Sequence, residues 1–583
     1  MNRTKPRLCM SRRGASVARL GMFAAGLSVV WTANAANCGD APVSGQKYYI
    51  VNKDSGLQLD VARVSQTVGA DVIQWTGSSQ TNQQWTFSEL YRGIWTIRPV
   101  HSGQALDLLS YNPSENAAVK QYTYSGNANQ QWLLANSGDA YTIASNSSKK
   151  LLTVGDRTAG SAVKLNSDQQ GSGLQRWYFN PVDGKCSTGA TGPWGSFMGF
   201  NRILIGGQLD ERDPNNPNDT NRTDTINKAP WDLRYSYIHS ATAPYAACYS
   251  KCELGCRGSP DGAWWGCWGM SSDGKWNTEP GVNIRTTNEK NANGYKLNGQ
   301  PHRMIHQWTW YSGEDLGKMQ GRLNQVAGGS GAADYKGAVQ NWGLLKSYLD
   351  DYRFLLKKVG TEKNIIHLEP DFFGFLRNAT GDNPHAAYAP VRFAGGDDCK
   401  SEEESLAGLV GCMVKMTRQY APNSTVGLHF TCWNFKDAEK AKTCVTYYKE
   451  LGAGKGDFLV ADVTDRDAAY AEYVENKGKS YWWNDQDFAS FLSVIKGVTE
   501  AVGKPMILWQ IPLGNENQWN ATDHWKDQKV QLLFDHMEDL AKAHVVALQF
   551  GAGWGEQTST ATDGGYLLKH AQDYYNKGGV RLK

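Results

Sequence analysis

The phrase Asn82-Gln83-Gln84-Trp85-Thr86-Phe87 recurs twice further along the chain, as Asn129-Gln130-Gln131-Trp132-Leu133-Leu134 and as Leu174-Gln175-Arg176-Trp177-Tyr178-Phe179. The copies are about 45 residues apart, and each places a tryptophan before a short apolar run. A unit this short cannot bury its apolar side alone, so the copies have to pack against one another. The pattern therefore predicts a closed all-β unit with threefold internal symmetry.

A second phrase keeps step with the first: Ser55-Gly56-Leu57-Gln58-Leu59-Asp60, then Ser102-Gly103-Gln104-Ala105-Leu106-Asp107, then Ser148-Lys149-Lys150-Leu151-Leu152-Thr153. With a Gln-x-Trp in each copy, residues 44–181 resemble the ricin-B type lectins, or family-13 carbohydrate-binding modules. The resemblance implies a β-trefoil domain over residues 38–186 and a polysaccharide or glycan as its partner.

Each lobe of such a lectin can hold one sugar, through an Asp, an aromatic platform and the Asn of the repeated phrase. An aromatic ring suits the apolar face of a pyranose, and a carboxylate suits its hydroxyl rim. In the third lobe Thr153 and Leu174 replace the Asp and the Asn, so we expect that lobe to pack without binding. The three repeated tryptophans, Trp85, Trp132 and Trp177, are expected in the core. The resemblance implies these sugar-binding residues: Asp60, Trp75 and Asn82 in the first lobe, and Asp107, Tyr122 and Asn129 in the second.

The amino terminus has the pattern of a secretory signal peptide. Six basic residues and no acidic one accompany an apolar run over residues 20–31, and the small residues up to Ala36 form a cleavage site. We therefore expect residues 1–36 to be removed and the protein to be secreted or periplasmic. Without that basic segment, the formal net charge of +3 becomes negative. The charge favours neither a nucleic-acid partner nor insertion in a membrane, and we expect a monomer.

Cleavage would leave ten of the 11 cysteines, an even number in an oxidising compartment. Cys38 and Cys186 flank the trefoil and are placed to pair. The other predicted pairs are Cys399 with Cys412 and Cys432 with Cys444. Cys248, Cys252, Cys256 and Cys267 form a local cluster, for which disulfides are favoured over a zinc site.

After a linker at residues 187–194, the pattern changes to an alternation of strands and helices. Nearly continuous apolar runs of this length are typical of strands that are covered on both faces. We expect eight strands, within residues 197–205, 233–239, 303–308, 364–369, 425–431, 457–462, 505–510 and 545–550. Helices are expected at residues 341–358, up to 420 from a capping box of Ser401 and Glu404, and at 438–451, 485–502, 525–543 and 566–575. Eight such units over residues 195–583 predict an α/β fold, a (β/α)8 TIM-type barrel, with a doubly wound open sheet as the alternative.

Barrel enzymes carry their active site at the carboxyl ends of the strands, where this chain places carboxylates, amides and tryptophans. Glycoside hydrolysis needs two carboxyl groups, one to donate a proton and one to act as a nucleophile or base. The candidates are Glu369 and Asp371 after the fourth strand, and Asp462 and Asp465 after the sixth. Alternation along the fourth strand is expected to put His367, Glu369 and Asp371 on one face. The predicted substrate-binding residues are Trp310, His429, Trp433, Gln510 and Trp554.

The segment Leu368-Glu369-Pro370-Asp371 resembles the Glu-Pro-Asp strand of the family-six cellulases. That similarity covers about ten residues, and no catalytic assignment is carried over from it. The barrel resembles a glycoside hydrolase of unassigned family.

The sequence thus predicts a secreted glycoside hydrolase that cleaves a polysaccharide or glycan by paired carboxylates and is targeted by its lectin domain, with no metal and no cofactor. The main alternative is a non-catalytic glycan-binding protein or adhesin with an inactive barrel. An esterase or protease would need a nucleophile motif that the chain lacks, such as Gly-x-Ser-x-Gly.

Overall fold

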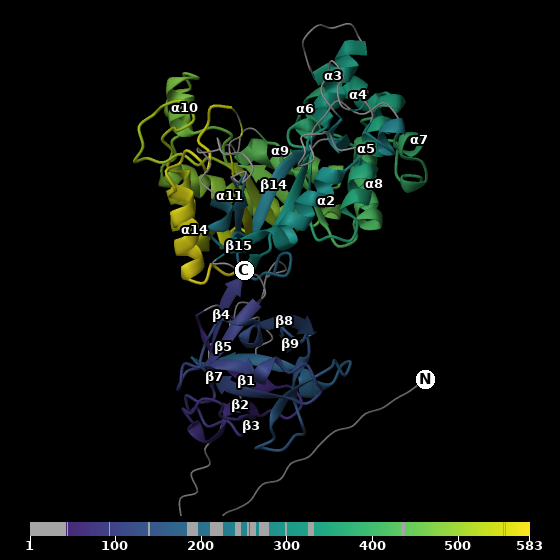
Figure 1. The fold of residues 1–583 in the computed structure, drawn as a ribbon. Helices are drawn as coiled ribbons and strands as arrows, with labels where there is room; N and C mark the ends of the chain where they lie inside the picture. Colours follow the sequence, from purple (N-terminus) through teal and green to yellow (C-terminus); the bar gives the residue numbers. More distant parts are fainter. Residues whose placement is uncertain are drawn as a thin grey trace, which may run out of the picture. The chain divides into compact units, whose positions relative to one another are not determined.

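The computed structural model describes residues 42, 45–91, 94–137, 140–183, 196–209, 225–238, 246–252, 256, 264–267, 279–297, 300–323, 332–432, 438–551, 553 and 555–582. The predicted signal peptide, the linker, Cys38, Cys186, Trp433 and Trp554 lie outside these residues. Two folded regions follow one another along the chain, and each is described by itself (Figure 1).

The amino-terminal region is an all-β unit in which three copies of four strands follow one another. Six strands pair antiparallel in a ring: β1 (Lys47–Asn52), β4 (Gln84–Tyr91), β5 (Ile94–Pro99), β8 (Trp132–Ser137), β9 (Ala140–Ser145) and β12 (Trp177–Pro181), which returns to β1. The other six form three hairpins: β2 (Gln58–Val61) with β3 (Val72–Trp75), β6 (Ala105–Leu108) with β7 (Ala117–Tyr122), and β10 (Leu151–Val154) with β11 (Val163–Asn166). This arrangement is the predicted β-trefoil.

The repeated tryptophans hold the three lobes together in the same way. Trp85, Trp132 and Trp177 are fully buried in one core. Their indole Nε1 atoms donate to the carbonyls of Leu59 (2.9 Å), Leu106 (3.0 Å) and Leu152 (3.0 Å) respectively. A buried indole N–H needs such a partner, so each tryptophan fixes one hairpin to the ring while it fills the core. The prediction that these side chains are core residues is confirmed.

The carboxy-terminal region contains a closed barrel of eight parallel strands flanked by helices (Figure 1). The strands, in order around the barrel, are β13 (Leu204–Gly207), β14 (Leu233–Ile238), β17 (Ile305–Trp310), β18 (Ile365–Leu368), β19 (Thr425–His429), β20 (Phe458–Asp462), β21 (Met506–Ile511) and β22 (Val545–Phe550). Each lies within or next to a predicted segment. The pairing of β22 with β13 closes the barrel and excludes the alternative of a doubly wound open sheet.

Most predicted helices form at the expected places: α5 (Trp342–Val359), α8 (Leu406–Tyr420), α9 (Ala438–Leu451), α11 (Asp485–Val502) and α14 (Tyr566–Asn576). Additional helices are α2 (Val282–Glu289), α3 (Gly313–Leu323), α4 (Ala332–Gln340), α6 (Phe372–Thr380), α7 (Val391–Gly395) and α10 (Ala468–Tyr473). β15 (Tyr295–Leu297) and β16 (Gln300–His302) form a separate hairpin.

Two helix predictions need correction. The predicted capping box of Ser401 and Glu404 does not start α8, because Ser405 is the N-cap and its hydroxyl accepts from the Gly408 amide. The helix expected at residues 525–543 is two helices, α12 (Lys529–Asp535) and α13 (Met537–Lys542), which are separated at His536, a residue outside the helical φ/ψ region.

Three disulfides join cysteines in the described part of the barrel region: Cys248–Cys256, Cys252–Cys267 and Cys399–Cys412. The third pair confirms a prediction, and the first two exclude zinc ligation by the four-cysteine cluster. Cys432 and Cys444 are buried thiols rather than the predicted disulfide, and a hydrogen bond with Cys432, together with burial, raises the pKa of Cys444. None of the described helices is long and apolar enough to cross a membrane.

Candidate functional sites

In the first two trefoil lobes, the predicted sugar-binding side chains share one face of a hairpin. Trp75 pairs with Gln58, two positions before Asp60 on β2, and Tyr122 pairs with Ala105, two positions before Asp107 on β6. Residues two apart on a strand point to the same side, so each aromatic ring is the diagonal neighbour of its carboxylate. Trp75 is 47% exposed and Tyr122 is 42% exposed, so both rings are available to a ligand.

In each of these lobes an asparagine side chain forms a hydrogen bond with the carboxylate. Asn82 Nδ2 donates to Asp60 Oδ2 (2.9 Å), and Asn129 Nδ2 donates to Asp107 Oδ2 (3.0 Å). The Oδ1 atoms of both asparagines are buried without a hydrogen-bond partner. Burial raises the pKa of Asp60 and of Asp107, and the amide donors oppose that increase. A buried acceptor without a donor is costly, and a sugar hydroxyl is a suitable donor.

The third lobe forms the same strands as the other two lobes but lacks their sugar-binding side chains. Thr153 turns its hydroxyl back to the Leu151 carbonyl (2.8 Å) and accepts from Gln175 (2.9 Å). Asn166 pairs with Leu151 at the position that Trp75 and Tyr122 occupy in the other lobes. Sequence alone did not locate this loss, because the count of seven residues that joins Trp75 to Asn82 leads back from Leu174 to Ser167 and not to Asn166.

In the barrel region, Asp371 and Asp462 lie at the carboxyl ends of β18 and β20. Asp371 is half-buried, and burial together with the charge of Asp462 raises its pKa. Tyr311 donates to Asp371 Oδ2 (3.4 Å), and the Asp371 amide donates to Thr431 Oγ1 (3.2 Å). The Asp462 side chain is 32% exposed, and its Oδ2 atom lies 3.3 Å from His429 Nε2. The structure therefore brings two of the four predicted acids near each other at the barrel mouth.

Glu369 lies apart from this pair and is fully buried. Its carboxyl group accepts from Tyr348 of α5 (2.7 Å) and from the amides of Ser312 (3.3 Å) and Gly313 (3.0 Å) at the start of α3. Burial raises the pKa of Glu369 to about 8 against these donors. The prediction that His367, Glu369 and Asp371 share a face is wrong, because φ is +54° at Glu369 and +67° at Asp371 and strand alternation ends there. We attribute to Glu369 the anchoring of α3 and α5.

Asp465 is paired with the neighbouring Arg466, which also binds Glu475. Asp465 thus belongs to a salt-bridged loop. Gln510 has φ of +48°, and its amide donates to Tyr237 on β14, so it faces the barrel mouth from β21.

Trp310 does not serve as the predicted sugar platform. It is fully buried and packs edge-on against Tyr348 and Tyr352 of α5, on the outer face of β17. Trp509 on β21 lies among the rings of Tyr235, His367 and His429.

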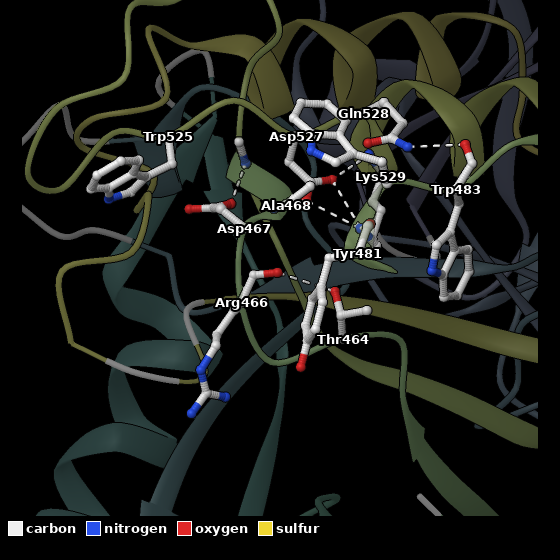
Figure 2. A network of polar contacts seen from close by, with 12 residues as sticks. Thr464, Arg466, Asp467, Ala468, Tyr481, Trp483, Trp525, Asp527, Gln528 and Lys529 are labelled. Carbon is white, nitrogen blue, oxygen red and sulfur yellow. Dashed lines mark hydrogen bonds and ion pairs between the residues drawn. The ribbon is translucent and has the colours of Figure 1, made fainter. Parts of the chain in front are cut away.

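A buried ionic cluster, which the sequence analysis did not identify, ties together the loops after β20, β21 and β22 (Figure 2). Lys529 and Asp527 are fully buried and form an ion pair (3.1 Å), and Lys529 Nζ also donates to the Tyr481 carbonyl (2.6 Å). Asp467 accepts from the amides of Gly514 (3.0 Å) and Thr558 (2.8 Å). Burial and the charge of Asp527 raise the pKa of Asp467 to about 7. The cluster fixes the loop that follows Asp462, and sequence alone could not pair residues so far apart. Among the described residues, no group of three or more His, Cys, Asp or Glu side chains is arranged to hold a metal ion.

Comparison with known proteins concerns the trefoil. The family model for ricin-type β-trefoil lectin domain-like sequences matches residues 30–122 and 81–166. ThreeFoil, a designed threefold-symmetric protein, is 38% identical, with 23% of this chain and 96% of that chain covered and a TM-score of 0.22. The exo-β-1,3-galactanase 1,3Gal43A of Clostridium thermocellum is 34% identical (23% of this chain, 30% of that chain, TM-score 0.23).

A lactose complex of the Macrolepiota procera ricin B-like lectin is 25% identical, with 24% of this chain and 98% of that chain covered and a TM-score of 0.22. A search of curated proteins finds no match. The family match extends to residue 166 and the observed strand pairing runs from Lys47 to Pro181, so the two overlap over residues 47–166. This chain contains a ricin-type β-trefoil lectin domain, a carbohydrate-binding module, at its amino-terminal end.

Proposed function

We propose that the protein is a secreted glycoside hydrolase whose barrel is a (β/α)8 TIM-type domain and whose trefoil holds the polysaccharide or glycan that the barrel cleaves. The observation that carries the proposal is the placement of Asp371 and Asp462 at the carboxyl ends of β18 and β20. The two carboxyl groups differ in environment, as acid and base roles require.

In this proposal Asp371 donates the proton to the leaving oxygen. Burial and the charge of Asp462 raise the pKa of Asp371, which keeps the acid protonated to higher pH. Asp462, more open to solvent and beside His429, acts as nucleophile or base. Gln510 is the predicted barrel residue that remains in position to contact the sugar, whereas His429 is fully buried. Trp433 and Trp554 stay predictions from sequence.

Secretion remains part of the proposal. Three disulfides are consistent with folding in an oxidising compartment, as the predicted signal peptide implies. In the non-catalytic alternative the trefoil still binds a glycan, but the barrel with Asp371 and Asp462 cleaves no glycosidic bond.

The test is the release of reducing sugar from a panel of polysaccharides by the full chain. Wild type is expected to cleave one class of polymer, and Asp462→Asn, with its fold checked by circular dichroism, is expected to cleave none. Glu369→Gln is the matched control, because it changes a neighbouring carboxyl that lies away from the mouth. Retention of a polymer without any cleavage would favour the glycan-binding alternative.

A further inference from the structure

A chain of polar side chains crosses the interior of the barrel and ends at Asp462. Five of its members are fully buried and come from four strands: Gln549 on β22, Gln307 and Thr309 on β17, His367 on β18 and His429 on β19. Polar groups in such a place are expensive unless they satisfy one another. Their contacts therefore define which atoms carry hydrogen.

The direction of the chain is set at its far end. Gln549 Nε2 donates to Gln307 Oε1 (3.2 Å), which leaves the Gln307 amide nitrogen facing Thr309 Oγ1 (3.4 Å) and His367 Nδ1 (3.4 Å). Thr309 Oγ1 also lies 3.1 Å from His367 Nδ1. An amide nitrogen can only donate, so His367 Nδ1 is an acceptor and the ring proton of His367 is on Nε2.

The proton position on His367 also determines the proton position on His429. His367 Nε2 lies 3.0 Å from His429 Nδ1, so His429 Nδ1 accepts and its own proton is on Nε2. That Nε2 atom makes no hydrogen bond among the described residues, and it lies 3.3 Å from Asp462 Oδ2, which is within ion-pair distance.

The imidazole rings of His367 and His429 are held in place by the side chains that pack around them. The two imidazoles stack with centroids 5.2 Å apart, and Trp509 packs edge-on against both. Burial lowers the pKa of His367 well below 6.5. The charged groups that face His429 are the carboxylates of Asp462 and Asp371.

We infer that the chain from Gln549 through His367 holds His429 as the neutral tautomer with hydrogen on Nε2, and that this N–H positions the Asp462 carboxylate at the barrel mouth. This inference rests on the proposed function and deepens it. Asp462 becomes the group that attacks or activates water, and Asp371 the proton donor. His367 and His429 are positioning residues, in the way that an outer carboxylate orients a catalytic imidazole.

The first test reads the tautomers directly in the full chain labelled with ¹⁵N-histidine. Two-bond ¹H–¹⁵N correlations at pH 7 are expected to give a pyridine-type Nδ1 and a pyrrole-type Nε2 for His367 and for His429, with assignment from His367→Gln and His429→Gln. Hydrogen on Nδ1 of either ring, or an imidazolium at pH 7, would overturn the inference. This readout needs no substrate, so it is decided even if the barrel cleaves nothing and the proposed function fails.

The second test uses kinetics on the polymer that wild type cleaves. His367→Leu removes the donor to His429 and is expected to lower kcat by about 10- to 100-fold with little change in KM, and to alter the pH dependence of kcat. His367→Gln keeps an N–H near the same place and is expected to retain more of kcat than His367→Leu. His306→Leu is the control for loss of a buried histidine, because His306 is on the outer face of β17. Equal losses in His367→Leu and His306→Leu would overturn the positioning role.

Discussion

The trefoil and the barrel separate structure from chemistry in different ways. In the trefoil, three nearly identical tryptophan-to-carbonyl bonds build the frame, and the binding groups differ between lobes by substitution at a few surface positions. In the barrel, the polar groups that would do the chemistry are continuous with the polar filling of the interior, from Gln549 to Asp462. A lobe can therefore lose its ligand without losing its fold, whereas a change at the barrel mouth reaches into the core.

The largest effect is expected at the two barrel acids. Asp371→Asn and Asp462→Asn should each lower kcat by about 10²- to 10⁴-fold on a polymer, because each removes a proton-transfer or nucleophilic group. In an aryl glycoside of a strongly acidic phenol, the phenolate can leave without being protonated. On such substrates Asp371→Asn should therefore recover much of the rate, and Asp462→Asn should not. Equal recovery of both variants, measured as phenol release, would refute the assignment of roles.

The next effect concerns the two binding lobes. Trp75→Ala with Tyr122→Ala should weaken retention on a polymer by about 10²-fold or more, since losing both platforms also removes avidity. The comparison is made in the Asp462→Asn background by co-sedimentation, so that the polymer stays intact. Tyr111→Ala, which removes a trefoil tyrosine that is 47% exposed and outside both sets, is the control. Unchanged retention in the double variant would place glycan binding elsewhere.

A smaller effect tests the anchoring role of Glu369. The folded protein keeps this carboxyl protonated to about pH 8, whereas the unfolded chain releases the proton near the ordinary value of 4.5. The contribution of Glu369 to stability is thus full below pH 4.5 and is lost as the pH rises to about 8, by up to about 1.4 kcal/mol per pH unit.

Glu369→Gln should flatten this part of the profile, read as the thermal unfolding midpoint at pH 5, 6, 7 and 8. Glu450→Gln, at an exposed site on α9, should follow wild type. A Glu369→Gln profile parallel to wild type would mean that the carboxyl is ionised in the folded protein.

The smallest effect is expected in the third lobe. Thr153→Ala should leave retention on the polymer without measurable change, because that lobe lacks both the carboxylate and the aromatic ring. A clear loss in the same co-sedimentation assay would show that all three lobes bind and would remove the contrast among them.

The sequence predicted the trefoil, its core tryptophans and the eight barrel strands because each depends on a local pattern or a repeat. Prediction failed where a backbone turn or a distant partner decides the outcome. Positive φ at Glu369 and Asp371 sends their side chains to opposite sides, which no alternation rule allows for. Trp310 packs in the core against α5, and Asp467 lies close to Asp527 only because loops that are distant in the sequence converge (Figure 2).

The central claim is that one glycan is held by the trefoil and cut by the barrel. The most direct measurement takes the polymer that retains full-length Asp462→Asn and follows the appearance of reducing ends when wild type is added. The account predicts steady release by wild type and none by Asp462→Asn from that same polymer. A polymer that binds the protein tightly and stays intact under wild type, or one that Asp462→Asn cuts equally fast, would contradict it.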